Sequence, residues 1–327
     1  MFKILFNTVV GIVLIFIWSK FVNLPEIFLT ISKVNLIYLL PIFLFMLLSP
    51  TLRAIRLKIF LSEKKKISLK DLIFLNGVAM CLNFFIPIRA GEVAKGVYLN
   101  TTYDLNLGKS VVWIFLDRFV DFLVVLLLAG IFLFVIPTSL NPTFIKVITI
   151  ILTLALLLTY LAVFQINLSR KLVNLLRALL IEKHIKIYFD RFTSFILDSF
   201  SILDRHPKDL SLMILITILA YAADAAIWYF TFISLGASMD FLKMYLGQLL
   251  SALTYLIPAA PGYVGSAEAS GLLILSGVFG INANLASAMI VLFHILSAVF
   301  VLIYGLISIF SLKINLGFIL KKALKRT

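Results

Sequence analysis

The chain has 327 residues, of which 62% are hydrophobic and 13% are charged, and its mean hydropathy is +1.13. Soluble domains are about half apolar and about a quarter charged, so soluble, disordered and disulfide-rich secreted proteins are excluded as classes. Lys and Arg outnumber Asp and Glu by 29 to 15, a net charge of +14. In a chain this apolar, we interpret the excess as a determinant of membrane topology and expect no nucleic-acid partner. The composition predicts an all-α, polytopic membrane protein.

Six apolar stretches are long enough to cross about 30 Å of hydrocarbon as helices. They are residues 4–22, 34–57, 110–136, 143–164, 210–235 and 283–312. The first follows Lys3 but has no small-residue cleavage site behind it, so we interpret it as a retained helix rather than a signal peptide. Two shorter stretches, 72–87 and 241–257, each run into a Pro/Gly break and are followed by second short helical pieces, 91–105 and 265–280.

Basic residues predict the sidedness, because cytoplasmic loops carry an excess of Lys and Arg. Three segments are rich in them: the stretch 53–71 with Arg53, Arg56, Lys58, Lys64, Lys65, Lys66 and Lys70; the stretch 165–209 with eight bases; and the tail with Lys313, Lys321, Lys322, Lys325 and Arg326. By contrast, 137–142 has no charge and 236–242 has only Asp240. We therefore expect both termini on the cytoplasmic side of the plasma membrane. Residues 165–209 are predicted to be a cytoplasmic amphipathic segment lying on the inner leaflet.

The alternation of basic and uncharged loops requires 72–109 to begin and end inside and 241–280 to begin and end outside. The simplest solution is two re-entrant helical hairpins that enter from opposite faces, which is tolerated only around protein or a wet cavity. The halves 34–136 and 210–312 also match at an offset of about 176 residues and run in opposite directions. Such inverted repeats with broken helices are typical of secondary transporters. We thus expect one integral membrane domain over 1–327, with six full spans and two re-entrant hairpins.

The first break carries three charges close together. Pro87 removes a backbone donor and Gly91 permits a tight reversal, while Arg89, Glu92 and Lys95 follow at helical spacing. A charge at bilayer depth costs on the order of several kcal/mol unless it is paired or hydrated, so three together predict a polar site. The alternative is a cluster at the interface whose side chains extend to water.

The next charged group opens the span 110–136. Asp117 and Asp121 share one face of the predicted helix, and Arg118 is placed to pair with either of them or with Glu92. The structural alternative is an internal ion-pair network that only ties this span to the hairpin.

The second break contains two prolines and two glycines within eight residues: Pro258, Pro261, Gly262 and Gly265. Glu268 follows near the start of the returning half-helix, where the helix dipole favours a carboxylate. The free N–H groups there could instead hold a lipid phosphate, or Glu268 is no more than a capping acid. Asp224 and His294 are lone polar residues within spans, and a lone helical histidine is more often a packing residue.

Other chemistry is not indicated. Cys81 is the single cysteine, which excludes an intramolecular disulfide, and His184, His206 and His294 lack metal-ligand spacing. The sequence shows no Walker loop, nucleophile elbow or nucleotide-binding glycine pattern. We therefore expect no metal, no other cofactor and no assigned catalytic residue.

Three motifs in this order resemble the family of the lysylphosphatidylglycerol synthase transmembrane region, also called flippase-like integral membrane proteins. They are Pro87-x-Arg89-x-Gly91-Glu92-x-x-Lys95, Asp117-Arg118-x-x-Asp121 and Pro258-x-x-Pro261-Gly262-x-x-Gly265-x-x-Glu268. The resemblance runs over nearly the whole chain and implies lipid handling. Larger members move aminoacylated phosphatidylglycerol between leaflets, and relatives are tied to polyprenyl, hopanoid or glycolipid pathways. The family often has Glu-Arg at Asp117-Arg118, Arg at Lys95 and Arg near His294. The sequence carries no soluble aminoacyl-transferase domain, so we do not expect it to synthesise lysyl-lipid.

The first functional hypothesis is a lipid flippase or transporter without a nucleotide-driven motor. Arg89, Lys95 and Arg118 would attract the anionic headgroup in a mid-membrane polar cavity, and Glu92 and Glu268 would pair with them or with a cationic substituent. The expected partners are membrane lipids, either an anionic phospholipid or a polyprenyl-linked lipid, with a second copy of the chain or an enzyme as further candidates.

Two other hypotheses remain open. One is an intramembrane enzyme that acts on a lipid-linked phosphate or sugar, with Asp117, Asp121 or Glu92 as general base. The other is a non-catalytic subunit of a lipid or cell-envelope pathway that presents its basic cytoplasmic face to a partner enzyme.

Overall fold

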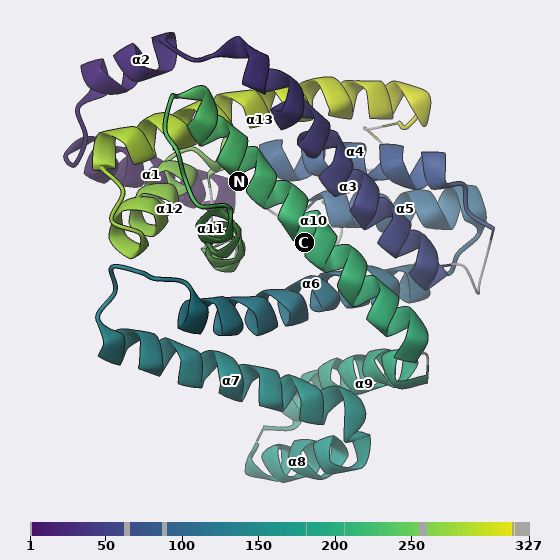
Figure 1. Cartoon of the computed structure of the whole chain (residues 1–327). Helices are drawn as coiled ribbons and strands as arrows, with labels where there is room; N and C mark the ends of the chain where they lie inside the picture. The colour runs from purple at the N-terminus through teal and green to yellow at the C-terminus, as the bar shows by residue number, and fades with distance from the viewer. Residues whose placement is uncertain are drawn as a thin grey trace.

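The computed structural model describes residues 2–61, 66–86, 90–180, 182–205, 207–254, 260–315 and 317. Within these residues the chain forms helices and their connections and no strand (Figure 1). The helices are α1 (Phe2–Ser19), α2 (Leu24–Ser32), α3 (Leu39–Leu61), α4 (Leu69–Phe85), α5 (Ala90–Tyr103), α6 (Leu107–Val135), α7 (Pro142–Phe164), α8 (Ile166–Leu179), α9 (Lys183–Arg205), α10 (Pro207–Ser234), α11 (Phe241–Thr254), α12 (Ser266–Leu272) and α13 (Ala283–Ser311). The predicted all-α class is confirmed.

Four helical segments are long and apolar enough to cross a membrane. They are Leu36–Leu61, Ser110–Val135, Lys208–Ser234 and Ala283–Ser311, close to four of the six predicted spans. In α7, which covers the predicted span 143–164, the apolar stretch is Ile145–Leu161. The predicted span 4–22 corresponds to α1, which ends at Ser19, and the chain then bends by 88° before α2. The bend follows from Asn23, whose side chain accepts from the N–H of Glu26 and so starts a new helix.

Both predicted hairpins contain a pair of short helices. In the first, α4 ends at Phe85 and α5 begins at Ala90, and the two helices pack side by side. Gly91 is helical, and its N–H donates to Oδ1 of Asn83 at 2.8 Å. A Cβ at Gly91 would collide with the backbone of Ala79, so this glycine serves close helix packing rather than the reversal itself.

The second hairpin breaks with left-handed backbone. A 3-10 turn, Pro261–Tyr263, precedes α12, and Gly262 and Gly265 have φ values of +69° and +82°. A Cβ at Gly265 would also collide with the carbonyl oxygen of Gly11, because α1 packs directly against this turn. Beyond α12 the helix widens into a π turn, Leu273–Val278. Pro87, Arg89 and Pro258, which the motifs include, lie outside the described residues.

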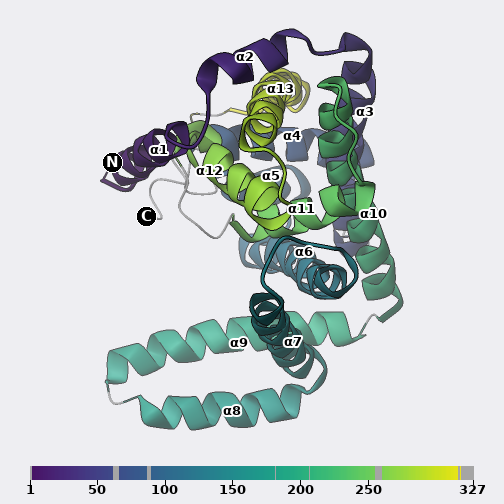
Figure 2. The same ribbon diagram turned by 60° about the vertical axis from the view of Figure 1, so that its left-hand side comes forward.

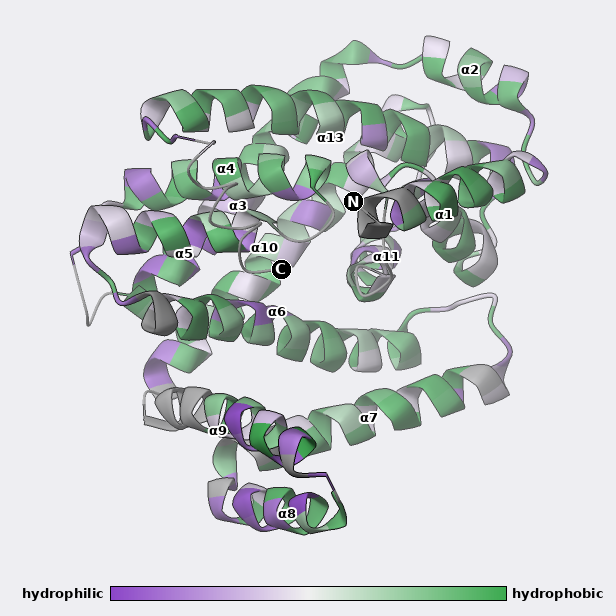
Figure 3. Cartoon of the chain, turned by 180° about the vertical axis from the view of Figure 1, so that it is seen from behind, coloured by the Kyte–Doolittle hydropathy of each residue, from purple (hydrophilic) through white to green (hydrophobic). Residues whose placement is uncertain are grey.

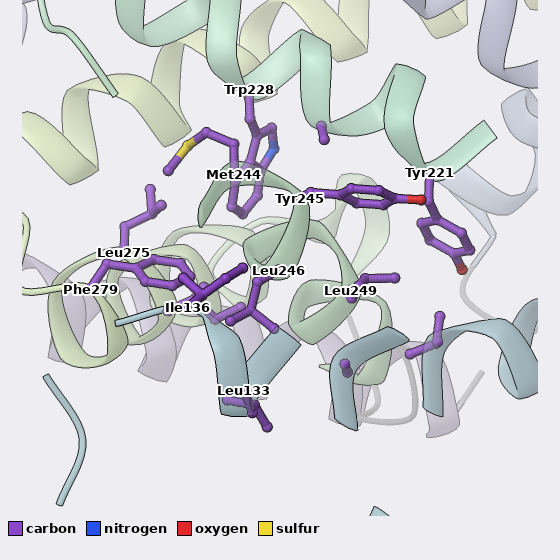
Figure 4. Packing of buried hydrophobic residues seen from close by; sticks show 14 of the residues in the cluster. Leu133, Ile136, Tyr221, Trp228, Met244, Tyr245, Leu246, Leu249, Leu275 and Phe279 are labelled. Atoms are coloured by element: carbon purple, nitrogen blue, oxygen red, sulfur yellow. The ribbon is translucent and has the colours of Figure 1, made fainter. Parts of the chain in front are cut away.

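The core forms where the two halves of the chain meet. The long helices α3 and α10 cross and pack along much of their length (Figure 1). The largest buried cluster joins α6, α10, α11 and the π turn, and Figure 4 shows the rings that fill it. Its members include Trp228, Met244, Tyr245, Leu249, Leu275 and Phe279. Aromatic and aliphatic side chains thus hold the second hairpin against the spans.

At one end of the bundle, backbone hydrogen bonds join the segments between consecutive helices in pairs. The N–H of Asn35 donates to the carbonyl of Ser234 at 2.8 Å, and the N–H of Ser139 donates to that of Val278 at 2.7 Å. The end of α3, the start of α4, the connection α5–α6 and the end of α13 lie at the opposite end, on the right in Figure 1. The bundle therefore has two distinct ends, as a membrane-spanning arrangement requires.

The predicted segment 165–209 folds mainly into α8 and α9. These helices form an antiparallel pair beside α7 (Figure 2). Nε of Arg177 donates to Asp190 at 2.7 Å across the pair, and Figure 3 shows hydrophilic residues among hydrophobic ones on both helices. The same pair exposes apolar side chains such as Leu175 and Leu179. Both polar and apolar surfaces are therefore present, as in helices that lie at a membrane interface.

Candidate functional site

Arg56 of α3 is completely buried, and its guanidinium reaches α6 and α10. Its Nε donates to Oδ1 of Asp117 at 2.8 Å, and its Nη1 donates to Oδ1 of Asp121 at 2.5 Å. The same Nη1 donates to Oγ1 of Thr217 at 2.7 Å. A single guanidinium can bridge the two carboxylates because residues four apart lie on one helix face. Arg56 thus ties three helices together inside the bundle.

Arg118 of α6 extends this group toward the first hairpin. Its Nη2 lies 2.9 Å from Oδ2 of Asp117, and its Nη1 lies 3.1 Å from Oδ2 of Asp121. On α5, carboxylate oxygens of Glu92 lie 3.8 Å from Nε of Arg118 and 3.7 Å from Nζ of Lys95. The Arg118 side chain is 36% exposed and that of Lys95 is 4% exposed. Arg118 is therefore the cation of this group that a ligand can reach.

These contacts form what we call the arginine network, a set of three cations and three carboxylates. Its members are Arg56, Lys95, Arg118, Glu92, Asp117 and Asp121. The formal charges balance, which is what permits burial, since an unpaired charge in a membrane interior is costly. The balance also means that removing any one member leaves a buried charge without compensation.

A second polar group lies between α3 and α10. Nη2 of Arg53 is 2.7 Å from Oδ2 of Asp224, and the hydroxyl of Ser49 donates to Oδ1 of that carboxylate at 2.5 Å. Arg53 also donates to Ser49 and lies 5.3 Å from the ring centre of Tyr221. Asp224 is therefore not a lone polar residue but half of an ion pair between the two crossing helices.

Glu268 forms a third group at the second helix break. Its Oε2 accepts from the N–H of Gly265 at 2.7 Å, and its Oε1 lies 2.6 Å from Nδ1 of His294. Nε2 of His294 lies 2.6 Å from the carbonyl oxygen of Gly262. His294, expected to be a packing residue, thus bonds α13 to both sides of the break. Glu268 caps α12, as the capping alternative predicted, and it also binds His294.

Phe84, near the end of α4, brings the two hairpins into contact. Its ring centre lies 6.0 Å from that of Tyr263 and 6.3 Å from that of His294. The tip of the first hairpin therefore reaches the second break, as expected if the two breaks share one region. The contact is aromatic; Arg89, which was expected to approach Glu268, lies outside the described residues.

The structure separates the predicted site residues into two places. Five of them, from Glu92 to Asp121, meet in the arginine network, and Glu268 lies with His294 instead. Arg53 and Arg56 were treated as cytoplasmic charges, and that interpretation was wrong, because both point into the bundle. Their spacing of three in an apolar helix was the available signal, since it puts both on one face. Within the described part of the chain, no three His, Cys, Asp or Glu side chains gather as metal ligands.

A family model described as the lysylphosphatidylglycerol synthase TM region matches residues 4–305. The chain belongs to this family. The match covers both hairpins and the arginine network, so these groups are parts of the family's membrane domain rather than of an added segment. A search of curated proteins finds no match to this chain.

Proposed function

We propose that this chain moves an anionic or lipid-linked amphiphile between membrane leaflets. The observation that carries the proposal is Arg118, a partly exposed guanidinium held by three carboxylates within a lysylphosphatidylglycerol synthase membrane domain. An anionic headgroup would take the place of one of the three carboxylates that contact Arg118. Because Arg56 still bridges Asp117 and Asp121, and Lys95 stays beside Glu92, each carboxylate keeps a cationic partner during that exchange.

An inverted repeat would provide the two states that transport requires. The offset of about 176 residues relates α3 to α10, α4 to α11, α5 to α12 and α6 to α13. The helix contacts agree with this correspondence. In one half α4 packs on α13 and α5 on α6, and in the other half the equivalent helices α11 and α12 pack on α6 and α13. Matching packing in the two halves supports a repeat whose halves can exchange roles, as in alternating-access transporters.

The repeat also relates two ion pairs. The same offset places Glu92 on Glu268 and Arg118 on His294. Each half therefore holds a carboxylate on its returning half-helix against a basic side chain on its last long helix. We place the headgroup path between these pairs, with the re-entrant hairpins entering from opposite faces.

The sidedness follows from the two ends of the bundle. The basic end of α3, the start of α4 and the end of α9 lie at the end of the bundle opposite the connections α2–α3 and α6–α7 (Figure 1). Under the positive-inside rule this end faces the cytoplasm, together with both termini. The α8–α9 pair would then contact anionic lipid headgroups on the inner leaflet.

Reconstitution of the purified chain in liposomes tests the proposed function. Labelled anionic lipid in one leaflet should exchange in the presence of wild-type protein and should not exchange with Arg118→Ala. The matched control is Arg177→Ala, which removes an exposed arginine of the α8–α9 pair that is also bound to an aspartate. Equal exchange in both variants would refute the assignment of Arg118. Recovery of a chemically altered lipid would favour the enzyme hypothesis instead.

A further inference from the structure

A groove of about 380 Å³ lies beside the second helix break. It is lined by Phe84, Gly262, Val264, Glu268, Val291, His294, Ile295 and Ala298. The lining is apolar except for the Glu268–His294 pair, whose side chains are 8% and 16% exposed. An ionisable pair in apolar surroundings is sensitive to its own net charge, because little solvent is present to compensate it.

The hydrogen bonds of His294 define how many protons the pair holds. The carbonyl of Gly262 can only accept, so Nε2 of His294 carries a hydrogen and donates to it across 2.6 Å. On the other side of the ring, Nδ1 and Oε1 of Glu268 lie 2.6 Å apart, which requires one further hydrogen between them. That hydrogen resides on the ring, giving imidazolium and carboxylate, or on the acid, giving two neutral groups. The pair is neutral overall in both cases.

We propose that Glu268 and His294 form a proton-binding site that sets the charge of this groove and couples lipid movement to a proton. Loss of the shared proton leaves a carboxylate facing the lone pair of Nδ1, and the groove changes from neutral to singly negative. A negative groove repels an anionic headgroup, and protonation admits it. The coupling rests on the proposed transport function; the proton site itself rests on the hydrogen bonds alone.

The first half of the repeat explains why only one pair is switchable. Its equivalent pair is Glu92 and Arg118, and the guanidinium of arginine stays protonated at any physiological pH. The second half holds an imidazole at the matching position, whose charge changes near neutral pH. The basic side chain of the first pair is thus permanently charged, and that of the second pair is charged only when it binds a proton.

In the described structure, charged groups on the elements packed against the pair either have partners elsewhere or lie in end turns of their helices. Neither α12 nor α13 carries an Asp, Glu, Lys or Arg other than Glu268 itself. Lys20, which follows α1, lies over Phe16, and Glu26 of α2 binds Asn284. On α4, Lys70 lies over Phe74 and Asp71 binds Tyr103. Asp224 of α10 binds Arg53 of α3, and Arg56 of α3 belongs to the arginine network. The remaining ones, Lys3 of α1, Lys58 of α3, Lys208 and Asp209 of α10 and Lys243 of α11, lie in end turns of their helices. A site-specific measurement on His294 separates the pair from all of these groups.

Nuclear magnetic resonance of the imidazole tests the proton site without any transport assay. The chain has three histidines, so His184→Gln with His206→Gln leaves His294 as the single labelled ring in the full-length protein. Its signal should titrate, and adding Glu268→Gln should move the midpoint by about one pH unit or more, since a shared proton couples the two groups. No titration between about pH 5 and pH 9, or the same midpoint in both proteins, would overturn the inference.

Leaflet exchange of fluorescent phosphatidylglycerol in proteoliposomes tests the coupling. Wild-type exchange should rise as the pH falls, by up to about tenfold per pH unit while the pair is titrating. With His294→Arg, which copies the pair of the first half, the remaining exchange should no longer depend on pH. Undiminished pH dependence in that variant would overturn the coupling. Absence of exchange from every protein would refute the proposed function instead, and the resonance titration would still decide the proton site.

Discussion

Removal of the Arg56 guanidinium is the sharpest test of the arginine network as a structural element. Arg56→Met keeps an unbranched apolar stem and deletes contacts at 2.8, 2.5 and 2.7 Å to Asp117, Asp121 and Thr217. Arg118 remains as the cation nearest to the two aspartates, so the network carries a net charge of about −1 within the bundle. Breaking a buried ion pair in this way costs about 3–5 kcal/mol of unfolding free energy.

Two further variants separate charge from geometry. Arg56→Lys keeps the positive charge, but an ammonium cannot reproduce the planar fork that binds two carboxylates and a hydroxyl at once, so an intermediate loss is expected. In Arg56→Met combined with Asp117→Asn, the charge balances again. We expect the double variant to lose less free energy than the sum of its single changes, with a coupling of about 0.5–3 kcal/mol.

The assay uses the single cysteine of the chain. Cys81 is buried between α4 and α13, so a thiol-reactive dye should label it only as the detergent-solubilised protein unfolds. The unfolding temperature should be highest for the wild type, lower for Arg56→Lys and lowest for Arg56→Met. If Arg56→Met unfolds at the wild-type temperature, burial of Arg56 does not stabilise the bundle and the argument fails.

Two other outcomes are expected. Gly265→Ala should unfold at a lower temperature than Gly236→Ala: both glycines have positive φ, but an added Cβ collides with the backbone of α1 at Gly265 and meets nothing within 4 Å at Gly236. Equal losses would remove the argument for close packing. In a chain without its native cysteine, Ser139→Cys should react with an impermeant thiol reagent from outside intact cells and Ser194→Cys on α9 should not; the reverse pattern would invert the topology.

The pattern of apolar residues in the sequence was sufficient to predict the bounds of the long helices. Residues 110–136 and 283–312 were predicted within a residue or two of the apolar helices Ser110–Val135 and Ala283–Ser311, because uninterrupted apolar runs have few other solutions in a membrane. The first span was harder. Its apolar run continues to residue 22, and only Asn23, an N-cap before a proline, signals the new helix that begins with the 88° bend.

The site was less accessible to sequence reasoning, because its partners come from distant elements. Glu92 and Asp117 were identified from charges in motifs, yet the fully buried arginine that binds Asp117 lies on α3, 61 positions away. Arg56 was counted with Arg53 and the lysines of the following loop, since the positive-inside rule considers charge and not direction. Arginines near the end of a membrane helix can point into the bundle and pair with carboxylates there. Such arginines are internal ion-pair partners and are not charges of a cytoplasmic loop.

His294 shows what the proposed repeat would add to reasoning from a single sequence. As an isolated histidine in an apolar helix it suggested packing, and its bonds to Glu268 and Gly262 cross a helix break that periodicity does not resolve. The internal offset, however, already relates it to Arg118, and each partner carboxylate lies 26 positions earlier. A separation kept in both halves is unexpected for unrelated polar residues, but it follows if each half must hold its returning half-helix against its last span. In the proposed repeat, the two halves thus share the contact and not the amino acid, which leaves one half free to use a permanent charge and the other a titratable one.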